Sequence, residues 1–121
     1  GHGAVLHGCR IRRNAMVGMN AVVMDEAVLG ENSILGALSF VKAGAVIPPN
    51  SMALGSPARV VRELTKEEIA WKTQGTAIYQ QLARDAPEKL VPVEPIMAVD
   101  PSRRRVKAPG YETLLAHRRE D

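Results

Sequence analysis

Two histidines near the start of the numbering are of a type and spacing that could bind a metal ion. His2 and His7 lie five residues apart, one on each side of Val5. Neutral imidazoles are common zinc ligands, and two of them with a further ligand and a water complete a tetrahedral site. Water bound in this way ionises near neutral pH and becomes a nucleophile. The spacing alone is a weak signal that favours exposed histidines without a role, and a Gly1-His2 pair left by cloning is a further alternative.

The elements that must position these histidines follow an interval of six residues. Aliphatic side chains or alanine recur at every sixth position: Val5, Ile11, Val17, Val23, Leu29, Leu35, Val41, Ile47 and Ala53. Neither the helical period of about 3.6 nor the strand period of about two produces such a repeat. A hexapeptide solenoid does, because each hexad forms one short strand and one turn of a parallel β-helix.

A second register of small residues supports the same fold. They come four positions after each aliphatic residue: Cys9, Ala15, Ala21, Ala27, Ser33, Ser39, Ala45, Ser51 and Pro57. Glycine (18, 30, 36) and asparagine (14, 20, 32, 50) recur beside these registers, and both tolerate the backbone angles of tight corners. His2 and His7 fall on neither register, so we expect both side chains to point outward near a corner.

Cys9 has two interpretations. It lies two residues beyond His7, and thiolates bind zinc well. Its place on the small-residue register favours packing inside a corner instead. As the single cysteine it cannot form an internal disulfide, which favours a reducing compartment and a cytoplasmic location.

Composition and charge exclude several classes of protein. Aromatic residues make up only 3% of the 121 residues, so the core must consist of Val, Ile, Leu and Ala. No apolar run approaches the roughly 20 residues that span a bilayer. The net charge of +3 comes largely from Arg103-Arg104-Arg105 and Arg118-Arg119. Without aromatic interleaving, these clusters indicate a solvated tail and no nucleic-acid partner.

The sequence predicts three segments: residues 1–57 as solenoid, 58–86 as connector and packing α-helix, and 87–121 as a proline-rich tail without long regular structure. Thr65 and Glu68 have the spacing of a capping box, which predicts a helix from about Lys66 to Arg84. Gly75 lies in the middle of this helix at a cost of about 1 kcal/mol and would permit a kink. Its expected apolar face consists of Ile69, Trp71, Ile78 and Leu82.

The sequence resembles the γ-class carbonic anhydrase-like hexapeptide proteins, especially the branch encoded with phenylacetate degradation and carnitine metabolism. The resemblance covers residues 1 to about 85. It depends on Gly1-His2-Gly3-Ala4-Val5-Leu6-His7-Gly8-Cys9, Val17-Gly18-Met19-Asn20, Val23-Met24-Asp25, Ser39-Phe40-Val41-Lys42-Ala43-Gly44 and Gly55-Ser56-Pro57-Ala58-Arg59.

This resemblance implies an all-β solenoid, a left-handed parallel β-helix with three hexads per coil, followed by a C-terminal α-helix and an irregular tail. It also implies a homotrimer that binds zinc, or another divalent ion such as iron or cobalt, at each subunit interface. His2 and His7 match the second and third metal ligands of the family, contributed from opposite sides of an interface, and His117 matches none. The family's first ligand and its catalytic acidic, arginine and glutamine residues precede the matched region. We therefore expect the chain to be the C-terminal part of a longer protein, with its N-terminal coils missing, or a relic of one.

Three functions remain open from the sequence. The first is a metal-dependent enzyme in which zinc hydroxide hydrates carbon dioxide or hydrolyses an acyl-CoA thioester, inactive in this fragment if the missing ligand is essential. The second is a hexapeptide acyltransferase using acetyl-CoA, supported by the stretch from Pro48-Pro49-Asn50 to Gly55-Ser56-Pro57-Ala58-Arg59. In that case a histidine acts as general base toward an acceptor hydroxyl. The third is a non-catalytic trimeric accessory protein. Both enzyme readings imply a small-molecule substrate, and none implies a membrane.

Overall fold

The structure is a computed structural model that describes residues 1–103. The predictions made for Arg104, Arg105, His117, Arg118 and Arg119, and for the tail beyond position 103, lie outside this range. Ten strands and one helix follow in order within it. They are β1 (Val5–Leu6), β2 (Arg10–Ile11), β3 (Met16–Val17), β4 (Val22–Val23), β5 (Val28–Leu29), β6 (Ile34–Leu35), β7 (Phe40–Val41), β8 (Val46–Ile47), β9 (Ser51–Gly55), β10 (Ala58–Glu63) and α1 (Lys66–Lys89).

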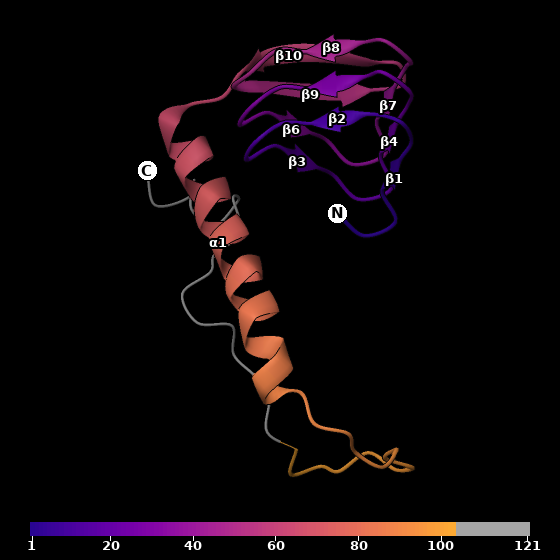
Figure 1. The fold of residues 1–121 in the computed structure, drawn as a ribbon, viewed down its shortest axis with the longest axis vertical. Coiled ribbons are helices and arrows are strands. Elements are labelled where there is room, and N and C mark those ends of the chain that lie inside the picture. Colours follow the sequence, from indigo (N-terminus) through magenta and orange to yellow (C-terminus); the bar gives the residue numbers. More distant parts are fainter. Residues whose placement is uncertain (104–121) are drawn as a thin grey trace. The chain divides into compact units, whose positions relative to one another are not determined.

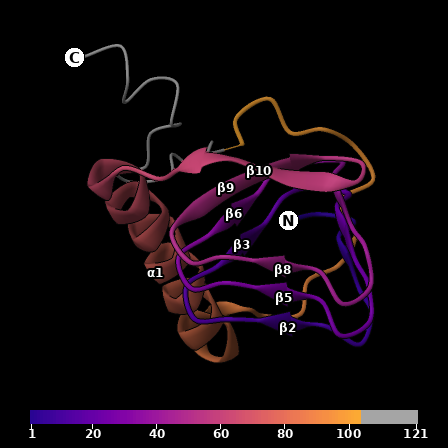
Figure 2. The ribbon, with the colours of Figure 1, turned by 90° about the horizontal axis from the view of Figure 1, so that it is seen from above.

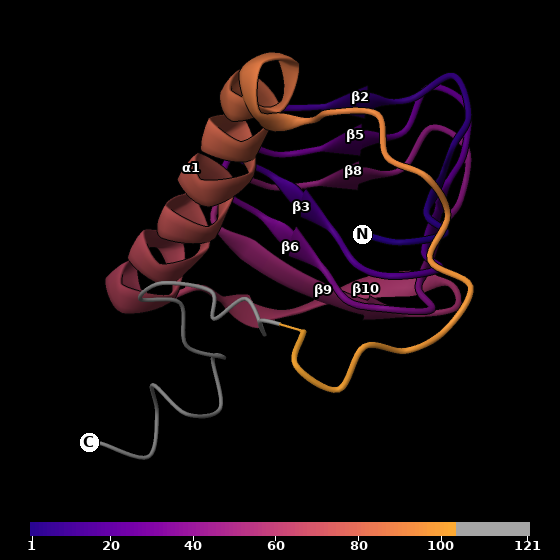
Figure 3. The same ribbon diagram turned by 90° about the horizontal axis from the view of Figure 1, so that it is seen from below.

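The strands form three sheets, one for each face of a solenoid (Figure 1). One sheet has the order β1-β4-β7, the second β2-β5-β8, and the third β10-β9-β6-β3. Figure 2 shows the second and third sheets along two faces of the coil, and Figure 3 shows the same faces from the opposite side. Every third strand is a neighbour in its sheet, which confirms a parallel solenoid with three hexads per coil.

The core of the solenoid is a column of aliphatic side chains that point into the coil. Val23, Leu29, Leu35 and Ala53 are completely buried, and Val41 and Ile47 are nearly so. The small residues Ala21, Ala27, Ser33, Ser39 and Ser51 are also buried beside them. Both registers of the hexad are therefore confirmed from β4 to β9.

The predicted ladder is wrong at its first member. The strand partners are Val5↔Val22 and Leu6↔Val23, a separation of 17 positions, whereas Ile11↔Leu29 is a separation of 18. Leu6 and not Val5 is therefore aligned with the core residue Val23. The first coil has one residue fewer than the second between Leu6 and Ile11. A repeat of six residues in the sequence cannot show which corner is shorter.

The corners explain the glycine and asparagine positions in two different ways. Asn14, Asn20, Asn32 and Asn50 have φ between 54 and 57°, in the left-handed region that asparagine tolerates. Gly18 and Gly30 do not have positive φ, so the expectation of unusual backbone angles is wrong for them. A Cβ atom at Gly18 would lie 2.4 Å from the amide nitrogen of Ala37, and one at Gly30 would lie 2.4 Å from the nitrogen of Pro49. These glycines are needed because the next coil passes too close for a side chain.

Residues 58–63, predicted to belong to a connector, form strand β10 instead. β10 pairs antiparallel with β9, in the register Ala58↔Gly55 and Arg59↔Leu54, and the pairing is irregular between Val60 and Arg62. The turn at Gly55-Ser56-Pro57 thus closes a hairpin on the last coil. The antiparallel strand covers the edge that β9 would otherwise present to solvent.

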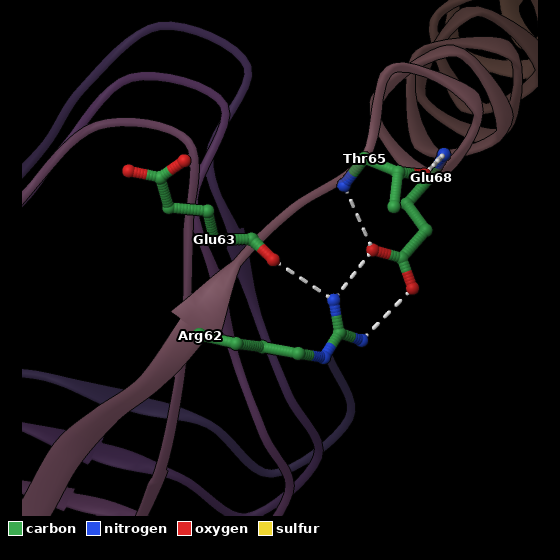
Figure 4. Close-up of polar contacts among 4 residues, drawn as sticks. All are labelled: Arg62, Glu63, Thr65 and Glu68. Atoms are coloured by element: carbon green, nitrogen blue, oxygen red, sulfur yellow. Dashed lines mark hydrogen bonds and ion pairs between the residues drawn. The ribbon is translucent and has the colours of Figure 1, made fainter.

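A capping box starts helix α1, as predicted (Figure 4). The Thr65 hydroxyl accepts from the Glu68 amide at 3.2 Å, and the Glu68 carboxylate accepts from the Thr65 amide at 3.1 Å. The same carboxylate also accepts two hydrogen bonds from the Arg62 guanidinium, at 2.7 and 2.9 Å. This paired contact raises the pKa of Arg62 above its ordinary value. Arg62 therefore joins the end of β10 to the first turn of the helix.

The helix differs from its prediction in length and in its buried face. It runs to Lys89 and passes through Gly75 without an interruption. Three residues of the predicted apolar face, Ile69, Trp71 and Ile78, are half-buried, whereas Leu82 is 57% exposed. The fully buried residues are Glu68 and Lys72, which hydrophobic periodicity could not indicate because they are polar.

Lys72 and Thr73 connect the first turns of α1 to a ladder of asparagines. Lys72 Nζ donates to the backbone and side-chain oxygens of Asn14, and Asn14 Nδ2 donates to Thr73 Oγ1 at 2.9 Å. Asn14, Asn32 and Asn50 are themselves linked by side-chain hydrogen bonds of 2.9 Å from coil to coil. By its contacts, residues 1–73 form one compact unit, and the described residues after position 73 belong to a second. None of the described helices is long and apolar enough to cross a membrane.

Candidate metal site

His7 follows strand β1 directly and is paired with Asp25 of the next coil. The His7 Nδ1 atom lies 3.0 Å from Asp25 Oδ1, and the two side chains are 67% and 51% exposed. A carboxylate next to Nδ1 favours the tautomer that carries its proton there, and this leaves Nε2 with a free lone pair. Metal-ligating histidines are typically oriented by such a carboxylate. In this arrangement Nε2 is the ring nitrogen that remains open to a ligand.

The first coil is one residue shorter than the second, and the difference lies next to the His7–Asp25 pair. The His7 amide donates to Val23 O in the way that Met24 donates to Val41 O, so His7 corresponds to Met24. From Arg10 onward the separation is 18 residues. Gly8 alone therefore occupies the corner that the next coil builds from Asp25 and Glu26. This shortened corner leaves room for the Asp25 side chain to reach His7.

Gly8 is required for this approach for two reasons. Its φ of +57° is unfavourable for residues with a Cβ atom. A Cβ at this position would also lie 2.6 Å from Asp25 Oδ1, which is too close. The glycine therefore opens the space in which the carboxylate and the imidazole meet.

His2 lies in the corner that precedes β1, so the two predicted ligands are at opposite ends of that strand. His2 is exposed, as expected for an outward position. Its backbone carbonyl accepts a hydrogen bond from the Asn20 amide at 2.9 Å. The structure thus places both histidines on the outside, but it does not bring them together. Within residues 1–103 there is no group of three or more His, Cys, Asp or Glu residues that could hold a metal ion.

Two further residues, Cys9 and Asp25, lie in the same region as His7. Cys9 is partly buried and packs against the aliphatic core, which agrees with the packing interpretation. Asp25 was not identified from the sequence as a site residue. The available signal was its position 18 residues after His7, one coil length, with a glycine beside His7 to admit it. That signal becomes useful only once the coil length and the shortened corner are known.

Comparison with known proteins agrees with the hexapeptide fold. The family model "Bacterial transferase hexapeptide (six repeats)" matches residues 8–43. Among solved structures, a hexapeptide transferase family protein from Anaplasma phagocytophilum is similar with a TM-score of 0.66 and 38% identity, over 69% of this chain and 51% of that one. A Bacillus cereus protein assigned as an acetyltransferase is similar with a TM-score of 0.63 and 40% identity, over 64% of this chain and 45% of that one.

The fold and these matches define the class: the chain is a hexapeptide-repeat protein. More particularly, it is homologous to the carnitine operon protein CaiE, so its resemblance to the carnitine-operon branch is confirmed. The CaiE protein of Citrobacter koseri is 55% identical over 107 residues, and that of Salmonella newport is 50% identical over the same length. Each match includes 88% of this chain and 54% of the relative. The chain therefore spans about half the length of these curated relatives.

Proposed function

We propose that this chain is part of a metal-dependent, carbonic anhydrase-like protein: a left-handed β-helix that assembles as a homotrimer in the cytoplasm. His2 and His7 act as ligands of zinc, or of iron or cobalt, at the contacts between subunits. The observation that carries the proposal is the His7–Asp25 pair, because it leaves Nε2 of an exposed imidazole free to bind a metal.

The residues present fit part of such a site. His7 has an oriented ring and an accessible nitrogen, and His2 is exposed on the far side of β1. Two ligands at opposite ends of one strand serve a shared ion when a neighbouring copy brings its own His2 or His7 to the same place. One chain supplies two of the three histidines that the resemblance to the family implies.

Zinc at a site of this kind supplies water that is activated near neutral pH, for attack on carbon dioxide or on a thioester carbonyl. The chain's own residues have a positioning role in this proposal. Asp25 holds the proton of His7 on Nδ1 and fixes the direction of the ring. Gly8 keeps the path between the two side chains open.

Metal content and assembly state test this proposal directly. The chain is purified with zinc, and zinc per subunit is measured by elemental analysis beside the mass in analytical ultracentrifugation. We expect roughly one zinc per subunit of the full-length protein and its loss in His7→Ala. His117→Ala, which removes the histidine without a family match, is the control and should keep its zinc. A trimer whose zinc content is equal in both variants would contradict the metal site.

A second candidate is an acyltransferase that uses acetyl-CoA. It is favoured by the 40% identity and the TM-score of 0.63 to the Bacillus cereus protein assigned as an acetyltransferase. If this candidate is correct, acetyl-CoA raises the thermal midpoint of the metal-free chain. If instead the trimer forms without metal and neither acetyl-CoA nor zinc stabilises it, the non-catalytic accessory role is supported.

A further inference from the structure

A hollow on the β2-β5-β8 face has the composition of a binding site for an organic anion. Its volume is about 520 Å³, within the usual range of small-molecule sites. Arg12 and Arg13 line one part of it, and Val28, Val46 and Pro49 supply apolar lining. We propose that it binds a small carboxylate with a short aliphatic chain, the carboxylate on the arginines and the chain along the valines.

The solenoid register explains why a hollow forms here. Arg10, Val28 and Val46 are aligned in successive strands, so the two valines stack along the face. Gly30, 18 positions after Arg12, also lines the hollow. The next coil passes so close to Gly30 that no side chain fits there, and the surface beside the valines therefore stays recessed.

The charges of the hollow are available for a ligand. Among residues 1–103, no hydrogen bond or ion pair engages the guanidinium of Arg12 or of Arg13. Glu31 also lines the hollow, so the net charge of its lining is +1. Two arginines outweigh one glutamate and offer the fork of donors that matches a carboxylate in a bidentate contact.

The apolar lining distinguishes this site from a simple patch of positive charge. Val46 lies on strand β8 of the last coil and is 67% exposed. An aliphatic chain of a few carbons would cover it and Val28 while its charged end reaches the arginines. Neither an inorganic anion nor an uncharged alcohol can make both contacts.

Calorimetric titration with sodium hexanoate tests the proposal on the full chain, treated with chelator so that metal binding plays no part. Hexanol and inorganic phosphate serve as the uncharged and the purely anionic comparisons. We expect hexanoate to bind at least about tenfold more tightly than either, because it alone satisfies both halves of the hollow. Equal affinity for hexanoate and hexanol, or no binding of hexanoate, would overturn the proposal.

Variants locate the binding. Arg12→Gln with Arg13→Gln should weaken hexanoate binding at least about tenfold. Arg10→Gln is the matched control, since Arg10 lies two residues before Arg12 but does not line the hollow, and it should change the affinity less than about twofold. Val46→Asp places a negative charge in the hollow at an exposed position and should abolish binding with an unchanged circular dichroism spectrum. If these variants leave hexanoate binding intact and alter only the oligomeric state, the face is a contact between copies and the proposal fails.

Discussion

The Nδ1 atom of His7 and the Oδ1 atom of Asp25 lie 3.0 Å apart, although the residues belong to successive coils. The contact exists because the first coil is one residue shorter at this corner, where Gly8 replaces the pair Asp25-Glu26. A local irregularity in a regular solenoid thus creates the one oriented imidazole in the candidate site.

Asp25→Asn should weaken zinc binding while leaving the fold intact. The amide keeps the shape of the side chain but removes the charge that holds the His7 proton on Nδ1. We expect a loss of roughly tenfold in affinity or more, the range found for outer partners of metal-bound histidines. Competition with a zinc-binding dye measures this, and Glu26→Gln in the same corner is the control. An equal loss in both variants would show a general effect of charge and not a role for Asp25.

Gly8→Ala should destabilise the chain more than Gly44→Ala. Both glycines have positive φ, +57° and +70°, so each alanine costs about 1–2 kcal/mol in the backbone. At Gly44 nothing lies within 4 Å of the added Cβ, whereas at Gly8 it meets Asp25 Oδ1 at 2.6 Å. The Gly8 variant alone should also lose zinc affinity. Urea unfolding measures the first effect, and equal stability losses would mean that the Asp25 contact yields without cost.

Lys72→Met should change how stability depends on pH. Burial lowers the pKa of Lys72 below its ordinary value near 10.5, so the folded chain releases this proton more readily than the unfolded chain. Between the lowered value and 10.5 the unfolded state binds more protons, and the free energy of unfolding contributed by Lys72 therefore rises with pH.

The difference in unfolding free energy between the wild type and Lys72→Met isolates this effect from other groups. It should be constant at neutral pH and grow through the alkaline window, with the variant about 1–2 kcal/mol less stable because Asn14 loses its donor. Urea titrations at a series of pH values measure it. Parallel curves for the two proteins would show that Lys72 is not desolvated.

Leu38→Asn should stabilise the isolated chain. Leu38 has φ of +58°, a strained conformation for leucine, and it is 75% exposed. Asn20, which has the corresponding place one coil earlier, shows that asparagine suits this corner. We expect a gain of about 0.5–1 kcal/mol in unfolding free energy. If the variant is less stable and its oligomer dissociates, Leu38 is instead buried in a contact between copies.

The sequence determined the period of the solenoid, the residues of its core after the first coil's Val5, the capping box of α1 and the outward position of both histidines. Each of these follows from local chemistry: a repeat of aliphatic and small side chains, a hydroxyl three residues before a glutamate, and polar residues off the buried register. The sequence alone also placed Cys9 in a packing role. These features depend on residues that are neighbours in the chain or that recur at a strict period, and the amino-acid sequence shows both directly.

The tertiary structure decided which residues meet across coils. The 17-residue step at β1 aligns Leu6 with the core in place of Val5 and brings Asp25 to His7. Lys72 and Thr73 of α1 form hydrogen bonds with Asn14. Because these contacts are polar, hydrophobic periodicity could not predict them. A repeat fixes how residues are spaced along the chain. Only the stacking of the coils fixes which corner lost a residue, and therefore which side chains are close enough to act together.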